Sequence, residues 1–392
     1  MIDLDALQSE MTSWRRELHR HPEFGFEEKR TAAFVAAKLR AFGVDDVVEA
    51  VGGTGVVGTL RRGRGNRSIA LRADMDALRI EEQGDREYKS QNRGLMHACG
   101  HDGHTAMLLG AAKLLSENGG FEGTIQFIFQ PAEEWGRGAL AMLADGLMER
   151  FPFDEIYGLH NMPGYPVGQF RVRPGAMMAA EDNFEIALRG VGGHASRPHV
   201  GSETLVAACA LVLNLQTIVS RRIDPSATAV VSVTEFLTDG ARNVLPGLAR
   251  VLGDVRSFSP DVSAAIERQM RLIAEGTARA HNVAFEVAYS REFVALINDA
   301  ACTGEALAAA SEALGADNVE IAEAPITASE DFAHFLGRVP GCFAFLGAGV
   351  DGPPLHNPAY DFNDRVLLGG VRFYEAIVRR RLRSANGQTA SR

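Results

Sequence analysis

The segment MHACGHDGH carries the residues best suited to chemistry. In it, Cys99 and His101 stand two residues apart, directly before an apolar run with helical periodicity, and His97 and His104 lie nearby. A thiol and several imidazoles this close together form a donor set suited to zinc, manganese, cobalt or nickel. The alternative is a loop of buried histidines that each find a separate hydrogen-bond partner. Asp102, at the start of the helix, could serve only as its cap.

Two pairs of carboxylates follow apolar runs that read as strands. Asp74 and Asp76 follow SIALR, and because alternate residues of a strand share a face, both carboxylates point the same way. Glu133 and Glu134 follow FIFQP. One of two adjacent glutamates can bind a metal while the other accepts a proton from water. Acidic residues after strands also commonly satisfy turns, so neither pair is decisive alone.

Two further histidines lie at a predicted strand end and in a predicted loop, where metal ligands can converge. His160 ends the apolar run IYGLH, and His356 lies in the proline-rich segment PPLHNPAYDFND. Taken singly, each is more often structural than a ligand. Together the chain offers five metal-type residues that we expect at one edge of a sheet: Cys99, His101, Glu134, His160 and His356.

The apolar periodicity predicts an α/β fold with a mostly parallel sheet covered by helices on both faces. Ligands bind at the carboxyl ends of the strands in such sheets. The expected helices are 5–19, 27–42 and 102–117, and the expected strands are 55–60, 68–73, 123–129 and 155–160.

From about residue 181 the pattern changes to a β-α-β-β-α-β order with long helices over 203–219 and 261–281. This order predicts an inserted α+β open-faced sandwich over residues 181–294. The first domain is therefore expected to be discontinuous, comprising 1–180 and 295–392. It resumes with a helix over 300–314 and ends with one over about 364–382.

Charge and composition exclude several classes of protein. The formal net charge of −10 argues against nucleic-acid binding, which needs a basic face. We expect no signal peptide and no membrane span, because no window approaches about 18 uninterrupted apolar residues. Four scattered cysteines predict a reducing, cytoplasmic location. GGTGVVG matches a dinucleotide fingerprint but continues with strand periodicity, so no nucleotide is expected there.

Seven motifs taken together strongly resemble the hippurate hydrolase branch of the peptidase M20 family. They are RADMDAL, MHACGHDGH, QPAEE, YGLHN, GGHAS, SEDFAHF and LHNPAYDFND, and the resemblance covers residues 10–380. It implies a two-metal, aminopeptidase-like catalytic domain and an inserted lid that forms a homodimer or a dimer of dimers. The chain departs from the family pattern at Trp135 and Arg137, near the acyl side, where small residues are usual, and after Leu78, where a proline is expected.

The resemblance assigns the five metal-type residues to two divalent ions. Cys99 would bridge the ions, with Glu134 and His160 completing one site and His101 and His356 the other. The ions would be Mn²⁺ or Zn²⁺, with Co²⁺ or Ni²⁺ as other possibilities.

The resemblance also assigns the remaining roles. Glu133 would be the general base and acid, and Asp76 would orient a ligand from behind the metals. In the lid, His194 would reach the substrate of a partner subunit and donate to the developing oxyanion. Asn243 and Arg256 would bind the substrate carboxylate.

The implied reaction is hydrolysis of the amide bond of small N-acyl amino acids, of N-acetyl, N-benzoyl or indole-acetyl type. A metal-dependent aminohydrolase that releases ammonia from an aromatic amine is the alternative on the same centre. A zinc nucleobase deaminase is disfavoured, because its H-x-E and P-C-x-x-C signature is absent. A binding protein on this fold would be expected to have lost Glu133 or a ligand.

Overall fold

The computed structural model describes residues 2–383, and the chain divides into two compact units. Unit 1 comprises Met1–Met177, Ile297–Ala324 and Glu330–Arg392, and unit 2 comprises Met178–Leu296 and Pro325–Ser329. The sequence prediction placed residues 325–329 in the first domain. The structure groups them with unit 2, because Ile326 forms a bridge with Met178 and Ala328 accepts a hydrogen bond from the Ala179 amide at 2.9 Å.

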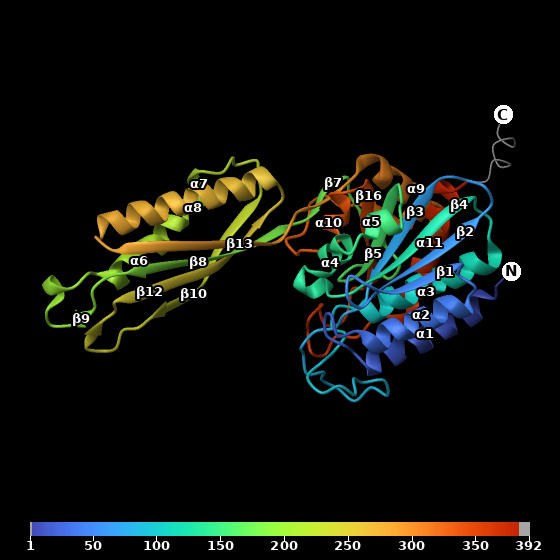
Figure 1. Ribbon diagram of the computed structural model, residues 1–392, viewed down its shortest axis with the longest axis horizontal. Helices are drawn as coiled ribbons and strands as arrows, with labels where there is room; N and C mark the ends of the chain where they lie inside the picture. The colour runs from blue at the N-terminus through green and yellow to red at the C-terminus, as the bar shows by residue number, and fades with distance from the viewer. Residues whose placement is uncertain (1, 384–392) are drawn as a thin grey trace. The chain divides into compact units, whose positions relative to one another are not determined.

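Unit 1 contains an eight-stranded sheet whose four central strands are parallel (Figure 1), which confirms the predicted α/β class. The outer pairs β1–β2, β2–β4 and β16–β6 are antiparallel, whereas β6–β15 is parallel. In spatial order the strands are β1 (Asp46–Val51), β2 (Gly55–Arg62), β4 (Gly123–Gln130), β3 (Ser68–Asp74), β5 (Glu155–Pro163), β16 (Gly341–Gly349), β6 (Phe170–Val172) and β15 (Val319–Ile321). The GGTGVVG segment enters β2, so it is a strand as expected.

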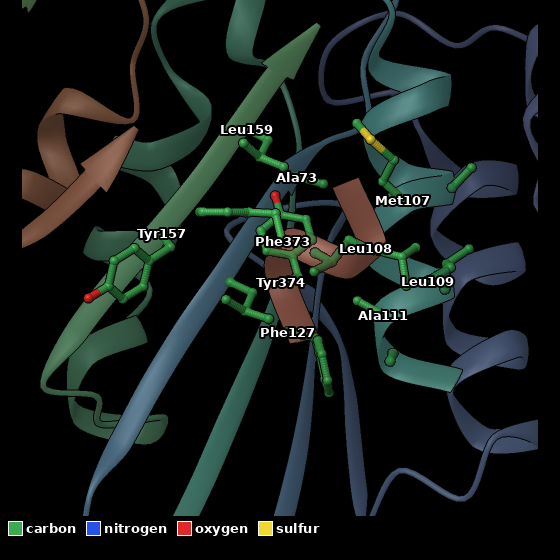
Figure 2. Packing of buried hydrophobic residues seen from close by; sticks show 14 of the residues in the cluster. Ala73, Met107, Leu108, Leu109, Ala111, Phe127, Tyr157, Leu159, Phe373 and Tyr374 are labelled. Carbon is green, nitrogen blue, oxygen red and sulfur yellow. The ribbon is translucent and has the colours of Figure 1, made fainter. Parts of the chain in front are cut away.

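Five long helices pack on this sheet and share one hydrophobic core. They are α1 (Leu4–Arg20), α2 (Lys29–Ala41), α3 (His101–Asn118), α9 (Ala300–Leu314) and α11 (Leu367–Arg381). Shorter helices are α4 (Gly138–Ala144), α5 (Leu147–Arg150) and α10 (Ala333–Leu336), with 3-10 turns η1 (Glu133–Trp135), η3 (Ala316–Asn318) and η4 (Asp364–Val366). Figure 2 shows Leu108 of α3 beside Phe373 and Tyr374 of α11 in the core.

Unit 2 has the predicted β-α-β-β-α-β order, with two helices on one face of a four-stranded antiparallel sheet (Figure 1). Its main elements are β8 (Ala180–Arg189), α6 (Thr204–Leu215), α7 (Thr217–Arg221), β10 (Ala229–Thr238), β12 (Leu248–Ser257), α8 (Pro260–Ala280) and β13 (Ala284–Phe293). The short strands β9 (Gly193–His194) and β11 (Val244–Leu245), which are far apart in the chain, pair antiparallel, and η2 (Pro198–Val200) follows β9. The remaining strands, β7 (Gly175–Met178) and β14 (Leu296–Asn298), pair with each other.

Two details differ from the sequence prediction. The helix expected over 203–219 is interrupted at Gln216 and continues as α7. The short strands β1, β6 and β15 were not expected, because three to six residues carry little periodicity and pairing with neighbouring strands decides their conformation. Among residues 2–383, no helix combines the length and apolar composition needed to cross a bilayer.

A matched pair of leucines tests this description of the core. Leu108 of α3 is fully buried, whereas Leu140 of α4 is 39% exposed. We expect Leu108→Ala to lower the free energy of unfolding by about 2–5 kcal/mol, because it leaves a cavity in a packed core. Leu140→Ala should cost about 1 kcal/mol or less. Urea unfolding of both variants measures this, and equal losses would contradict the assigned packing.

Candidate metal centre

Three neighbouring parallel strands bring the predicted site residues to one edge of the unit 1 sheet. β3 ends at Asp74, β4 ends at Gln130 just before the η1 turn, and β5 carries His160 near its end. Because parallel neighbours end at the same edge, these side chains converge although they are far apart in sequence. The loop that precedes α3 closes the site from the adjacent layer.

That loop places Cys99 and His101 through a glycine. Gly100 has φ of 100°, and a side chain there would lie 2.3 Å from Asn161 Oδ1, so only glycine fits. The sharp turn lets His101 begin α3 while Cys99 stays in the loop. Cys99 Sγ lies 3.3 Å from His160 Nε2.

Two groups of donor atoms share Cys99. Cys99, His101 and His160 form one group, and Cys99, Glu134 and His356 form the other, with all ligand atoms of a group within 4.8 Å of one another. This grouping of nearby donor atoms differs from the predicted pairing of Glu134 with His160 and of His101 with His356, and the assignment of ligands to each ion stays a prediction. The physical reason for the grouping is the strand order: β5 lies beside β3, so His160 meets the first turn of α3, whereas η1 meets the His356 loop.

Hydrogen bonds orient the two buried histidines toward the shared thiol. His101 Nδ1 donates to the Asp76 carbonyl at 3.0 Å and to Asp76 Oδ1 at 3.1 Å. His160 Nδ1 donates to the Asn161 carbonyl at 2.6 Å. Each imidazole therefore offers Nε2 toward the cluster, as metal-binding histidines do. Asp76 Oδ2 also accepts the Glu134 amide at 3.0 Å, so this residue aligns ligands of both groups, consistent with its predicted orienting role.

Two buried donor atoms in this cluster have no hydrogen-bond partner within residues 2–383. They are His101 Nε2 and Glu134 Oε1, which lie 3.9 Å apart. Buried polar atoms are rarely left unpaired, because the loss of hydration is costly. One thiol, three imidazoles and one carboxylate that converge with free electron pairs fit two divalent cations.

The remaining histidines of MHACGHDGH are already occupied or isolated. His104 Nδ1 donates to Asp74 Oδ1 at 2.6 Å, and its Nε2 accepts the Asn161 amide at 3.0 Å. The group of Asp74, His101 and His104 therefore has less free donor capacity than the two groups around Cys99. His97 is buried, and burial lowers its pKa to about 4, so it is a neutral side chain beside the site.

The adjacent glutamates differ in electrostatic environment. Burial and the nearby charges of Glu330 and Glu134 raise the pKa of Glu133 well above its usual range. Burial also opposes ionisation of Glu134, but contact with His356 at 3.5 Å and the charge of His101 lower its pKa. Glu134 is thus suited to bind a cation, and Glu133 to take up a proton.

A fully buried arginine holds the carboxylates behind Glu133. Arg72 contacts Asp74 at 2.7 Å, Glu330 at 2.9 Å and Asp331 at 3.1 Å. The Asp331 amide lies 3.4 Å from Glu133 Oε1, so this network borders the predicted base directly. Sequence reasoning did not assign these residues, although an arginine inside the apolar strand SIALRAD is a signal of a buried ion pair.

The three residues predicted in the lid are not all brought together within unit 2. His194 lies on β9, with its Nδ1 accepting from the Ser196 hydroxyl at 2.8 Å, and the neighbouring Ala195 amide donates to the Asn243 carbonyl at 3.0 Å. Arg256 contacts Asp254 at 2.9 Å and Glu181 at 2.7 Å.

The four-stranded sheet of unit 2 separates Arg256 from the β9–β11 pair that carries His194. β12 pairs with β8 from Leu248 opposite Arg189 to Arg256 opposite Glu181, a span of about 26 Å from the strand rise. β9 follows the Arg189 end of β8, and β11 precedes the Leu248 end of β12, whereas Arg256 lies at the other end of this pairing.

Comparison with known proteins agrees with this geometry. Residues 70–380 match the model of peptidase family M20/M25/M40. Hippurate hydrolase of Campylobacter jejuni is 40% identical over 373 residues, covering 95% of this chain and 96% of the relative. N-acyl-L-amino acid amidohydrolase of Geobacillus stearothermophilus is 40% identical over 297 residues, 75% of this chain and 80% of the relative.

A solved structure resembles the whole chain. It is a Bacillus subtilis protein described as a dinuclear metal binding peptidase from the M20 family, with a TM-score of 0.83 and 32% identity over 96% of this chain and 99% of that one. Its dinuclear description and the two donor groups around Cys99 support two divalent ions. The resemblance drawn from the seven motifs is thereby confirmed, and the chain belongs to peptidase family M20/M25/M40 as a hydrolase of amide bonds.

Proposed function

We propose that the protein hydrolyses small N-acyl amino acids to a carboxylic acid and a free amino acid. The observation that carries this proposal is the arrangement of Glu133, which stands in the same turn as Glu134 but outside the two donor groups that share Cys99. The relatives named for hippurate and for N-acyl-L-amino acids support the substrate class.

The residues divide the chemistry of amide hydrolysis between them. Two divalent ions held by the Cys99 groups would lower the pKa of water toward neutrality and polarise the substrate carbonyl. Glu133 then accepts the proton of the attacking water as the oxygen–carbon bond forms. It delivers that proton to the amide nitrogen as the carbon–nitrogen bond breaks, so atoms and charge balance. The raised pKa of Glu133 favours the first step, uptake of the proton.

The chemical types of the donor atoms favour certain divalent metals. A thiolate and imidazoles are borderline-soft ligands that suit Zn²⁺, and Co²⁺ and Ni²⁺ accept similar sets, whereas Mn²⁺ tolerates imidazole with carboxylate. We propose Zn²⁺ or Mn²⁺ as the working ions. The four cysteines are free, which supports a reducing, cytoplasmic compartment.

We propose further that the lid acts across a homodimer, or a dimer of dimers. Within one lid, the length of β12, roughly 26 Å, separates Arg256 from the sheet end where the β9–β11 pair with His194 begins, and a small N-acyl amino acid cannot span it. If both His194 and Arg256 serve one substrate, they come from different copies. Asn243 would act together with His194, since it directly precedes β11 and its carbonyl accepts a hydrogen bond from the Ala195 amide next to His194.

Product analysis tests the proposed reaction directly. We expect the metal-reconstituted protein to release equal amounts of acid and amino acid from members of an N-acetyl, N-benzoyl and indole-acetyl amino acid panel, measured by mass spectrometry. Ammonia released from aromatic amines, with every amide left intact, would contradict amide hydrolysis and favour an aminohydrolase.

Replacement of each adjacent glutamate should change a different property of the enzyme. Glu133→Gln removes the base but no ligand, so kcat should fall by about 100-fold or more while the metal content stays near wild type. Glu134→Gln should instead reduce the bound metal, because it removes a ligand. Elemental analysis and turnover of both variants measure this, and a reversed pattern would exchange the two roles.

Mixing two inactive variants tests the lid assignment. If His194 acts across the interface, subunit exchange between His194→Ala and Glu133→Gln restores one intact site per mixed dimer. Activity should then return toward about a quarter of wild type at full random exchange. Exchange demonstrated by native mass spectrometry without recovered activity would contradict the shared site.

A further inference from the structure

We propose that Trp135 and Phe26 form an aromatic wall beside Glu133 that binds the acyl group, so that the enzyme favours planar aromatic acyl groups over acetyl. This inference rests on the proposed hydrolysis of N-acyl amino acids and deepens it by naming the residues that select the acyl group.

Trp135 stands in the same short turn as the two glutamates. The turn η1 runs Glu133–Trp135 and is closed by a hydrogen bond from the Gly136 amide to the Glu133 carbonyl at 2.7 Å. The indole is 44% exposed, an unusual amount of open apolar surface for so large a side chain. An aromatic side chain held open beside a site is typical of a binding surface.

Other rings fix one side of the indole and leave the rest open. The Phe24 ring meets Trp135 edge to face with centroids 4.7 Å apart, and the Phe26 ring does so at 6.4 Å. The Arg79 guanidinium covers Phe24, 3.9 Å from its ring centroid. The Phe24 ring is therefore already covered by Arg79, and Trp135 and Phe26 present the remaining aromatic surface.

The segment that carries the two phenylalanines is locked onto the glutamate turn. The Ala77 amide donates to the Glu23 carbonyl at 2.8 Å, and the Ala132 amide donates to Glu28 Oε1 at 2.8 Å. Gly25 lies so close to Ala132 that a side chain on it would approach the Ala132 Cα to 3.0 Å. The segment that carries Phe26 is therefore held against the residue that directly precedes the turn with Glu133 and Trp135.

The backbone of Phe26 has an energetically unfavourable conformation. Its φ of 64° lies in the left-handed region, which bulky residues rarely adopt. Such a conformation persists when its surroundings impose it, and it occurs preferentially at functional sites. Here the backbone directs the ring toward Trp135, and Gly53 provides the room, since a side chain at that glycine would lie 3.2 Å from the ring.

The apolar ring faces of the aromatic wall suit the acyl end of the substrate better than its amino acid end. The amino acid end carries a carboxylate, whose desolvation must be offset by hydrogen bonds or cations, and ring faces offer neither. A benzoyl or indolyl group instead gains by stacking and by leaving water. An acetyl group is too small to cover both rings.

Steady-state kinetics on two substrates with the same amino acid test this. We measure kcat/KM for the N-benzoyl and N-acetyl derivatives in wild type, Trp135→Ala, Trp135→Phe and the control Leu140→Ala, each with its metal content determined. The benzoyl-to-acetyl ratio should exceed one in wild type and fall about tenfold in Trp135→Ala. Trp135→Phe should retain most of the preference, and Leu140→Ala, at a similarly exposed position on α4, should retain all of it.

A ratio that Trp135→Ala leaves unchanged, with metal content at the wild-type level, overturns the aromatic wall while the proposed function stands. A wild-type preference for acetyl overturns it as well. If the wild-type protein hydrolyses neither derivative, nor any other N-acyl amino acid, the proposed function itself is contradicted, and the inference is overturned with it.

Discussion

An excess of buried negative charge at the carboxyl edge of the unit 1 sheet governs the rest of the structure. Arg72 is the only arginine or lysine that the described contacts place among these groups, and it is shared between three carboxylates. The buried or nearly buried carboxylates at this edge are Asp74, Asp76, Glu133, Glu134, Glu330 and Asp331. Burial of so many acids is costly unless cations compensate them, and the free donor atoms around Cys99 are where such cations fit. Burial and the surrounding carboxylates raise the pKa of the Cys99 thiol, so its deprotonation is coupled to the arrival of a cation.

Two residues next to the candidate metal centre have left-handed backbone conformations that non-glycine residues rarely adopt. Ala132, directly before the glutamate turn, has φ of 49°, and His356 has φ of 64°. Together with Phe26 they are three of the five non-glycine residues within 2–383 that have positive φ. A packed fold can sustain such conformations because the sheet and helices fix the flanking segments. The stability of the α/β core and the precision of the site are thus linked.

The fold and the convergence of the donor residues were predictable because they leave short-range signals. Apolar periodicity located most strands and helices. The two donor residues Cys99 and His101 in one segment indicated a metal site. The grouping of the donor atoms around Cys99 was not predictable, because it depends on β5 lying beside β3, a long-range pairing that no local pattern encodes. Asn161 and Asp331 were missed for a related reason. Their role comes from backbone and side-chain contacts with distant segments, and polar residues of this kind usually satisfy local turns.

Counting metal ions per chain tests the central claim, that Cys99 is shared by two ions, most directly. The metal-free protein is loaded with Zn²⁺ or with Mn²⁺, freed of excess ion and measured by elemental mass spectrometry, for wild type, Cys99→Ala and Cys342→Ala. Cys342 is equally buried in β16 but lies outside the donor groups. The account predicts two ions in wild type and Cys342→Ala, and fewer than two, bound more weakly, in Cys99→Ala. Two ions retained in Cys99→Ala with wild-type affinity would contradict it.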